Sequence, residues 1–187
     1  MTDAIHIPDA AAQPQDYVQA LLATLGERDP LDVLEATPGR VAALVRGIDE
    51  PVLRTAPRDT DWSAYHIGGH LLDVEVVYGF RMRLTLTEEA ARYPGYDEKR
   101  WGMLPRPSFA DVLAAFTALR ATNAHLLRNV AGEVWSRAGH HGEQGRDPFE
   151  LQVRKLAGHD LAHIDQMERT LLVVTGRLRR TSSPGLQ

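Results

Sequence analysis

The chain has 187 residues, of which 43% are hydrophobic and 25% charged, values typical of a single globular domain that buries a core. It contains no cysteine, which excludes disulfides, thiolate metal ligands and an internal thiol nucleophile and fits a cytoplasmic protein. The net charge of -4, with basic and acidic residues intermingled, provides no surface for a phosphate backbone, so we expect no nucleic-acid partner.

We also expect no membrane partner. No window of the sequence approaches the roughly 20 apolar residues that a membrane span needs, and the first residues lack a basic stretch followed by an apolar run. One domain is expected to span residues 1–187. Its ends, 1–14 and 178–187, are expected to be flexible, the second because it is rich in Ser, Pro and Gly.

The first half of the chain shows helical periodicity with clear boundaries. Apolar residues at helical spacing predict a helix that starts near Pro14 and ends before Gly26. A short helical piece over 31–36 is expected next. Thr37 and Pro38 are then typical of an N-cap followed by proline at the first helical position, so a second helix is expected to begin there.

A long helix is predicted after the prolines of the next connection. Asp61 or Ser63 can cap it, and it runs to about Leu86. The residues expected on its inward face are spaced by three or four positions: His66, His70, Val74, Val77 and Arg81. Gly68 and Gly69 each cost about 1 kcal/mol relative to alanine in a helix interior. Such a conflict indicates either a close approach of the backbone to a neighbour or a loosely packed surface helix.

Residues 92–107 hold three prolines, two glycines and three aromatic residues, which favours an ordered loop over a helix or a strand. Three side chains of this loop are candidates to cover a pocket: Tyr96, Asp97 and Trp101. Ser108 and Asp111 then form a capping box, and the apolar residues that follow predict an amphipathic helix to about Val130.

The last helix follows a second loop, GHHGEQG. Asp147 and Pro148 are predicted to cap this helix and to occupy its first position, and Gly176 to end it after Thr175. No segment longer than a few residues alternates apolar and polar side chains as a half-buried strand does. We therefore expect an all-α fold, a bundle of four long helices with short additional ones.

Histidines on two of these helices indicate a metal site. His159 and His163 are four residues apart on the last helix, so their side chains lie one turn apart on one face, as two ligands of one ion must. Such a pair is also common in helices that bind no metal. The long helix that precedes the first loop offers His66 and His70, and two helices with inward histidines can enclose one ion. The spacing leaves open which residue completes the site.

The succession TPGRVAALVRGI, DWSAYHIGGHLLDVE, YDEKRW, GHHGEQG and GHDLAHIDQMERTL resembles the DinB/YfiT-like superfamily of bacterial four-helix-bundle metalloproteins. The resemblance runs over about 31–176 and keeps the order of the parts. It implies that the motif HL-x-D contributes His70 and that H-x-x-x-H contributes His159 and His163 as metal ligands. His66 lies outside the matched motif, and we expect it to be a polar residue of the first helical turn rather than a pocket residue.

Three imidazoles leave a divalent ion with open positions, which is the pattern of a catalytic rather than a structural site. Zn²⁺ is the first expectation, with Ni²⁺, Fe²⁺ or Mn²⁺ as alternatives. Each ligating ring needs an acceptor for its second N–H, and we expect Asp73 and Asp160 in that role, with Glu75 and Asp165 as surface charges. The remaining candidate pocket residues are His66, Tyr96 and His141.

Other histidines have weaker expected roles. His140 and His141 lie on the second predicted loop, where they either reach the site or face water. His6 and His125 are expected to have no part in it.

Characterised branches of the resembling family attach low-molecular-weight thiols such as bacillithiol or mycothiol to electrophiles, or isomerise maleylpyruvate with a thiol cofactor. A metal with an open position stabilises a thiolate, and without cysteine the sulfur must come from outside. We therefore expect a metal-dependent thiol S-transferase of detoxification, acting on a small-molecule electrophile and an external thiol. The resemblance also makes a homodimer a candidate assembly.

Two alternatives stay open. One is a metal-dependent hydrolase that uses metal-bound water, with Glu143 or His66 as the candidate general base. The other is a stress-related metal-binding bundle without catalysis.

Overall fold

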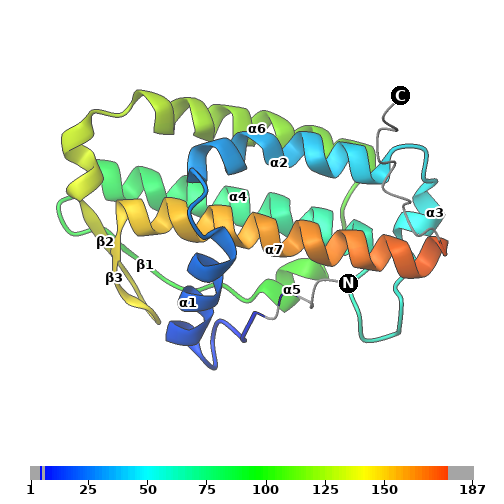
Figure 1. The fold of residues 1–187 in the computed structure, drawn as a ribbon. Helices are drawn as coiled ribbons and strands as arrows, with labels where there is room; N and C mark the ends of the chain where they lie inside the picture. Colours follow the sequence, from blue (N-terminus) through cyan, green and yellow to red (C-terminus); the bar gives the residue numbers. More distant parts are fainter. Residues whose placement is uncertain (1–4, 6, 177–187) are drawn as a thin grey trace, which may run out of the picture.

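The structure is a computed structural model that describes residue 5 and residues 7–176. Within this part of the chain four long helices lie side by side along one axis (Figure 1). They are α2 (Pro30–Val45), α4 (Ala64–Thr87), α6 (Phe109–Asn129) and α7 (Phe149–Thr175). The expected all-α bundle is confirmed. His6 lies outside the described residues, and so does the end at 178–187 that we expected to be flexible. The described residues do not test the expected flexibility of 1–14.

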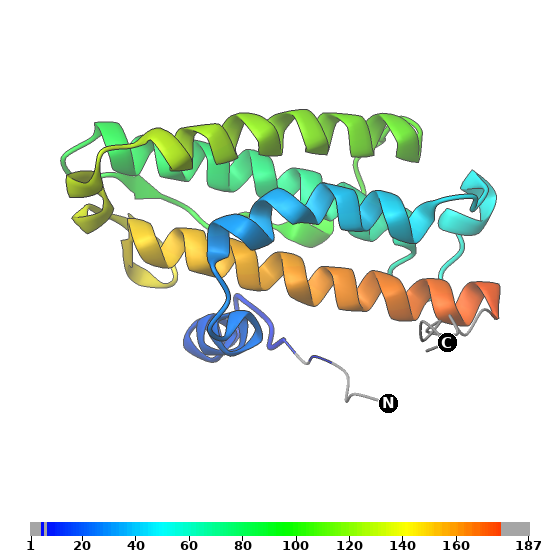
Figure 2. The same cartoon turned by 45° about the horizontal axis from the view of Figure 1, so that its top comes forward.

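Shorter helices complete the bundle, as expected. They are α1 (Pro14–Leu25), α3 (Glu50–Leu53), α5 (Glu98–Gly102) and the 3-10 helix η1 (Gly132–Ser136). The boundaries predicted for the first helix are confirmed, because Gly26 follows it with a φ of 59° that favours glycine. Figures 1 and 2 show that α1 lies across α7 rather than along the bundle axis. None of the helices in the described ranges is long and apolar enough to cross a membrane.

The helix boundary predicted at Thr37 and Pro38 is wrong. One continuous helix, α2, includes Pro38 in its interior. Proline has no N–H to donate to the carbonyl four residues earlier, that of Leu34. Arg120 of α6 donates to this oxygen instead, from Nη1 at 2.8 Å. A side chain of another helix therefore satisfies the carbonyl that the proline leaves free, and this allows the helix to continue.

The caps predicted for α4 and α6 are confirmed. The Oγ atom of Ser63 accepts a hydrogen bond from the backbone of His66, and that of Ser108 accepts one from the backbone of Asp111. Gly68 and Gly69 of α4 mark close contacts, because a Cβ atom at either position would overlap Phe109 or Arg106. The two glycines thus allow the start of α6 and the segment before it to pack closely on α4.

The last helix begins at Phe149 and ends before Gly176, which has a φ of 62°. The prediction that Asp147 caps this helix is wrong. Its carboxylate instead accepts hydrogen bonds from Lys155 Nζ at 2.7 Å and from the hydroxyl of Tyr93 at 3.0 Å. Asp147 therefore forms an ion pair with Lys155, two turns into the helix, in place of the expected cap on the first turn.

The two predicted loops contain more regular structure than expected. They form α5 and a small sheet of order β1-β2-β3, which lies at one end of the bundle (Figure 1). In it β1 (Arg92–Tyr93) pairs parallel with β2 (Ala138–His141), and β2 pairs antiparallel with β3 (Gly145–Pro148). Strands of two to four residues are too short to show alternation in the sequence.

Two apolar clusters fill the bundle on either side of a polar layer. One contains Ile67, Leu71, Phe109, Phe116, Ile164 and Met167, and the other contains Val74, Met82, Leu127, Phe149, Val153 and Leu156, with further residues in each. Between them lie buried polar side chains of three helices: His70, Glu75, Arg120, Asn123, His159 and Asp160. The candidate site belongs to this layer.

Candidate metal centre

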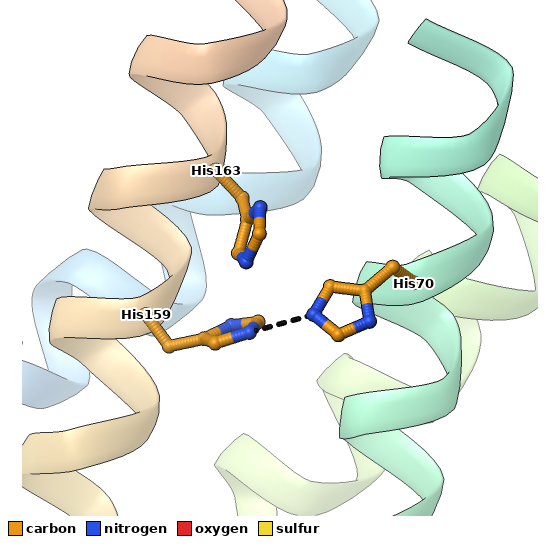
Figure 3. Close-up of side chains that lie close together, drawn as sticks. All are labelled: His70, His159 and His163. Atoms are coloured by element: carbon orange, nitrogen blue, oxygen red, sulfur yellow. Dashed lines mark hydrogen bonds between the residues drawn. The ribbon is translucent and has the colours of Figure 1, made fainter. Parts of the chain in front are cut away.

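Three histidines of the polar layer converge on one point between α4 and α7. Figure 3 shows His70 facing His159 and His163 across the space between the two helices. The Nε2 atoms of His70 and His159 are 2.9 Å apart. One nitrogen atom of each of the three rings lies within 4.8 Å of the other two. The structure thus brings together the three residues proposed as ligands.

The three rings are held in their neutral form. His70 and His159 are each 3% exposed, and burial lowers the pKa of both imidazoles well below the usual value, with the neighbouring histidines adding to the effect. Burial also lowers the pKa of His163. Neutral imidazoles keep a lone pair at pH 7, and this is the state in which histidine binds a metal.

This arrangement fits a metal ion. Two nitrogen atoms that bind the same ion at about 2.1 Å lie roughly 3 Å apart when the angle at the ion is near 90°. The separation of 2.9 Å between His70 and His159 is compatible with this, and it is also the length of a hydrogen bond between the two rings. No carboxylate in the described part of the chain joins the cluster, so an ion here would have three imidazole ligands and open positions.

Gln166 orients one of the three rings. Its Oε1 atom lies 2.7 Å from His163 Nδ1 and, as an acceptor, places the proton on that nitrogen. The lone pair of His163 is therefore on Nε2. Sequence reasoning missed Gln166, although its position three residues after His163 on the same helix was a usable signal.

The expected acceptors Asp73 and Asp160 do not have this role. Asp73 pairs with Arg106, and Asp160 pairs with Arg120 at 2.5 Å. Neither carboxylate accepts a hydrogen bond from the three histidines. Correspondingly, His159 Nδ1 is buried and has no hydrogen-bond partner among the described residues.

The expectation that Glu75 is a surface charge is also wrong. Glu75 is fully buried, and its carboxylate accepts hydrogen bonds from Arg120 Nε at 2.8 Å and Asn123 Nδ2 at 2.7 Å. Because Arg120 also bonds Asp160, one guanidinium links α4, α6 and α7 next to the histidine cluster. Asp165 does have the expected role, as a partly exposed residue paired with Arg169.

Comparison with known proteins decides the family. A family model described as the DinB superfamily matches residues 33–167 of the chain. The chain belongs to the DinB superfamily. The solved structure of YfiT from Bacillus subtilis, described as a probable metal-dependent hydrolase with an unusual four-helix bundle topology, matches this fold with a TM-score of 0.72. The two are 26% identical, and the match covers 79% of this chain and 86% of YfiT.

Sequence relatives within the DinB superfamily have similar descriptions. YfiT itself, named as a candidate metal-dependent hydrolase, is 27% identical over 149 residues, which is 75% of this chain and 83% of YfiT. A protein of Bacillus cereus strain B4264 with the same description is 24% identical over 143 residues, 74% of this chain and 83% of the relative.

Two cavities of this DinB protein are each lined by one histidine of the cluster. A cavity of about 840 Å³ is bordered by His163, and a second of about 470 Å³ is bordered by His159. They share four lining residues: Asp9, Ala10, Tyr17 and Glu98. Each cavity therefore borders the cluster through a different histidine of α7.

Aromatic residues line both cavities. Trp62 stacks on His163 with ring centroids 6.1 Å apart and lines the larger cavity. As expected, Tyr96 and Asp97 line the smaller one. Trp101 does not line it and packs on Tyr96 with ring centroids 4.9 Å apart. Trp62 was missed because nothing in its local sequence distinguishes it from a core residue.

Four further histidines lie in the described part of the chain, of which one lines a cavity and three do not. His141 is buried and lines the smaller cavity with Tyr96, whereas His140, its neighbour on β2, is exposed. His66 is exposed in the first turn of α4, with Nδ1 2.8 Å from Ser63 Oγ, which agrees with a polar first-turn residue. Its expected place on the inward face of this helix and its candidacy as a pocket residue are wrong, because it lines neither cavity. His125 is exposed on α6 and lines neither cavity.

Proposed function

We propose that His70, His159 and His163 bind one divalent metal ion, with Zn²⁺ as the first choice and Ni²⁺, Fe²⁺ or Mn²⁺ as alternatives. The observation that carries this proposal is the convergence of three neutral imidazoles, two of which each border a cavity. A bound ion would supply Lewis acidity, which lowers the pKa of a thiol or water at an open position.

We further propose that the protein transfers an external low-molecular-weight thiol to an electrophile. Two cavities at one cluster give room for two substrates. The nearby carboxylates of Asp73, Glu75 and Asp160 are each engaged in an ion pair with an arginine. A thiol needs little help from a base because its ordinary pKa is only about 8.5. The chain has no cysteine, so the sulfur must be supplied from outside.

Hydrolysis is the second candidate function, favoured by the description of YfiT as a metal-dependent hydrolase. Activation of water requires a general base. Of the two residues considered from the sequence, His66 is exposed and lines neither cavity, whereas Glu143 lines the smaller one. A hydrolytic reaction would therefore rely on Glu143.

Metal content tests the site directly. We expect untagged wild-type protein to contain about one equivalent of metal per chain, and His163→Ala to contain much less. His66→Ala is the matched control because this histidine lies outside the cluster and is exposed. Equal metal content in wild type and His163→Ala would reject the ligand assignment.

Activity assays separate the reactions. Metal-loaded protein is expected to accelerate conjugation of low-molecular-weight thiols to chlorodinitrobenzene or monobromobimane, and His70→Ala to lose this activity. Turnover of esters or amides without thiol, lost in Glu143→Gln, would favour the hydrolase instead. If neither activity is found and metal removal lowers the melting temperature, the ion has the structural role of the non-catalytic alternative.

A further inference from the structure

Arg81 of α4 is a buried cation without a carboxylate partner. The described part of the chain buries two arginines, Arg81 at 6% exposure and Arg120 at 2%. Arg120 pairs with two carboxylates, whereas no ion pair of Arg81 occurs among the described residues. The hydrogen bond of its guanidinium runs from Nη2 to the carbonyl of Pro94 at 2.7 Å. An unpaired charge at this depth is costly unless a ligand completes its environment.

The carboxylate buried at this end of the bundle is already engaged. Asp147 accepts hydrogen bonds from Lys155 Nζ and from the hydroxyl of Tyr93. The guanidinium of Arg81 lies 5.3 Å from the centre of the Tyr93 ring and 5.8 Å from that of Tyr78. Its planar group is therefore held by aromatic rings, while the charge is not neutralised by the protein.

His141 provides a fixed donor beside Arg81. Its Nδ1 atom accepts hydrogen bonds from the backbone N–H groups of Glu143 and Gln144, at 3.1 and 3.3 Å. In the neutral ring the proton is then on Nε2. Burial, assisted by Arg81, lowers the pKa of His141 to about 4, so the ring is neutral at pH 7.

Both residues line the cavity of about 470 Å³ that His159 borders. This volume is within the usual range for small-molecule sites. The side chains of Arg81 and His141 also contact the same aromatic ring, because His141 packs edge-on against Tyr93 with centroids 5.9 Å apart. A cation, an N–H donor and one histidine of the proposed metal centre thus line the same cavity.

The charges around the cavity favour a carboxylate over a phosphate. Four acidic side chains line it together with Lys99 and Arg81: Asp9, Asp97, Glu98 and Glu143. Asp9, Asp97 and Glu143 are exposed, so they occupy the solvent side of the cavity. One buried guanidinium and one N–H match a planar anion of single charge, whereas a dianion would meet repulsion from these carboxylates.

We propose that this cavity binds a carboxylate group of a substrate, with Arg81 as ionic partner and His141 Nε2 as hydrogen-bond donor. The reactive end of the same molecule then extends toward His159. The orientation of the substrate toward His159 rests on the proposed function. The class of substrate is an anionic thiol or an anionic electrophile. Arg81 also holds Pro94, so a purely structural role must be distinguished by the test.

Calorimetric binding of matched ligands makes this distinction. We expect mercaptohexanoate to bind the zinc-loaded protein at least about tenfold more tightly than mercaptohexanol, because a charge-assisted hydrogen bond is lost in the alcohol. Arg81→Met should abolish the preference, and Arg81→Lys should retain part of it. Lys99→Met is the matched control because this lysine lines the same cavity and is exposed, and it should keep the preference.

Equal affinity for the two ligands in wild type, or a preference that survives Arg81→Met, would overturn the proposal. Loss of stability in Arg81→Met with the preference intact would show a structural role alone. Hexanoate and hexanol, tested on metal-free protein, repeat the comparison without sulfur or zinc. If the three histidines bind no metal but the cavity binds a carboxylate, metal-free protein still binds hexanoate more tightly than hexanol.

A kinetic arm identifies which substrate carries the carboxylate. With mercaptoethanol as thiol, chloronitrobenzoate is compared with chloronitrobenzamide as electrophile. A KM at least about tenfold lower for the acid, lost in Arg81→Met, assigns the carboxylate to the electrophile. Equal KM values, together with tighter binding of mercaptohexanoate, assign it to the thiol.

Discussion

Gly158 of α7 lies against the backbone carbonyl of Leu21 in α1, so that a Cβ atom at residue 158 would overlap this group. The contact is next to His159, a proposed ligand. It also fixes α1, whose Tyr17 lines both cavities. A glycine is required here because only a residue without a side chain lets the two backbones approach so closely.

Gly158→Ala is therefore expected to lower the free energy of unfolding by about 1–3 kcal/mol, the usual cost of overpacking. Urea denaturation measures this change. Gly39→Ala is the control, because Gly39 also lies inside a helix but has nothing within 4 Å of its Cβ position. That variant should be as stable as wild type or up to about 1 kcal/mol more stable. Equal stability of Gly158→Ala and Gly39→Ala would contradict the close packing.

Arg120→Met is expected to lower the free energy of unfolding by about 3–5 kcal/mol, because it leaves the buried carboxylates of Glu75 and Asp160 without their cation. Arg128→Met, also on α6, removes only exposed ion pairs and should have a much smaller effect. Chemical denaturation of the two variants side by side provides the measurement. If the two variants lose similar free energy of unfolding, burial is not the reason why the ion pairs of Arg120 stabilise the protein.

Gln166→Ala is expected to weaken metal binding about 10- to 100-fold, because His163 then loses the acceptor that fixes its tautomer. Competition with a coloured zinc chelator measures the affinity. Glu168→Ala, an exposed change on the same helix, should leave the affinity unchanged. An unchanged affinity in Gln166→Ala would mean that this amide does not orient the ring.

The stability of the protein is expected to fall as the pH is lowered from about 6.5 to about 4, in part through His141. The pKa of this imidazole is about 4 in the folded protein, below its ordinary value of 6.5, which applies to the unfolded chain. Over this window the unfolded chain binds a proton at this position that the folded protein does not, so unfolding becomes easier as the pH falls.

His141→Gln removes this contribution. Denaturation by urea at several pH values between about pH 7 and pH 4.5 should show a shallower loss of stability for the variant than for wild type. The difference between the two proteins isolates this residue from the other buried histidines, which act in the same direction. Parallel curves would contradict the assignment of a buried neutral imidazole.

The parts of the fold that depend on neighbours in sequence could be predicted. Ser63 and Ser108 mark helix starts and Gly26 and Gly176 mark ends, because caps and periodicity are local signals. The spacing of four between two histidines of α7 placed both on one face. The third member, His70, came from the family resemblance rather than from spacing.

The parts that depend on distant partners could not be predicted. Glu75 has the appearance of a surface charge until Arg120 of α6 lies opposite it. Asp147 resembles a helix cap but bonds Lys155 and Tyr93, which lies 54 residues away. The short strands exist because separate segments meet at one end of the bundle, and such pairing leaves no periodic pattern in so few residues.

Pro38 removes the amide that would donate to the carbonyl oxygen of Leu34 four residues earlier in α2, and Arg120 of α6 donates to this oxygen instead. An alanine there would restore the missing donor and make α2 more regular by itself. The same change would set the new amide in competition with the guanidinium for the oxygen of Leu34. Intrinsic helicity and the cohesion of the whole bundle are therefore opposed at this position.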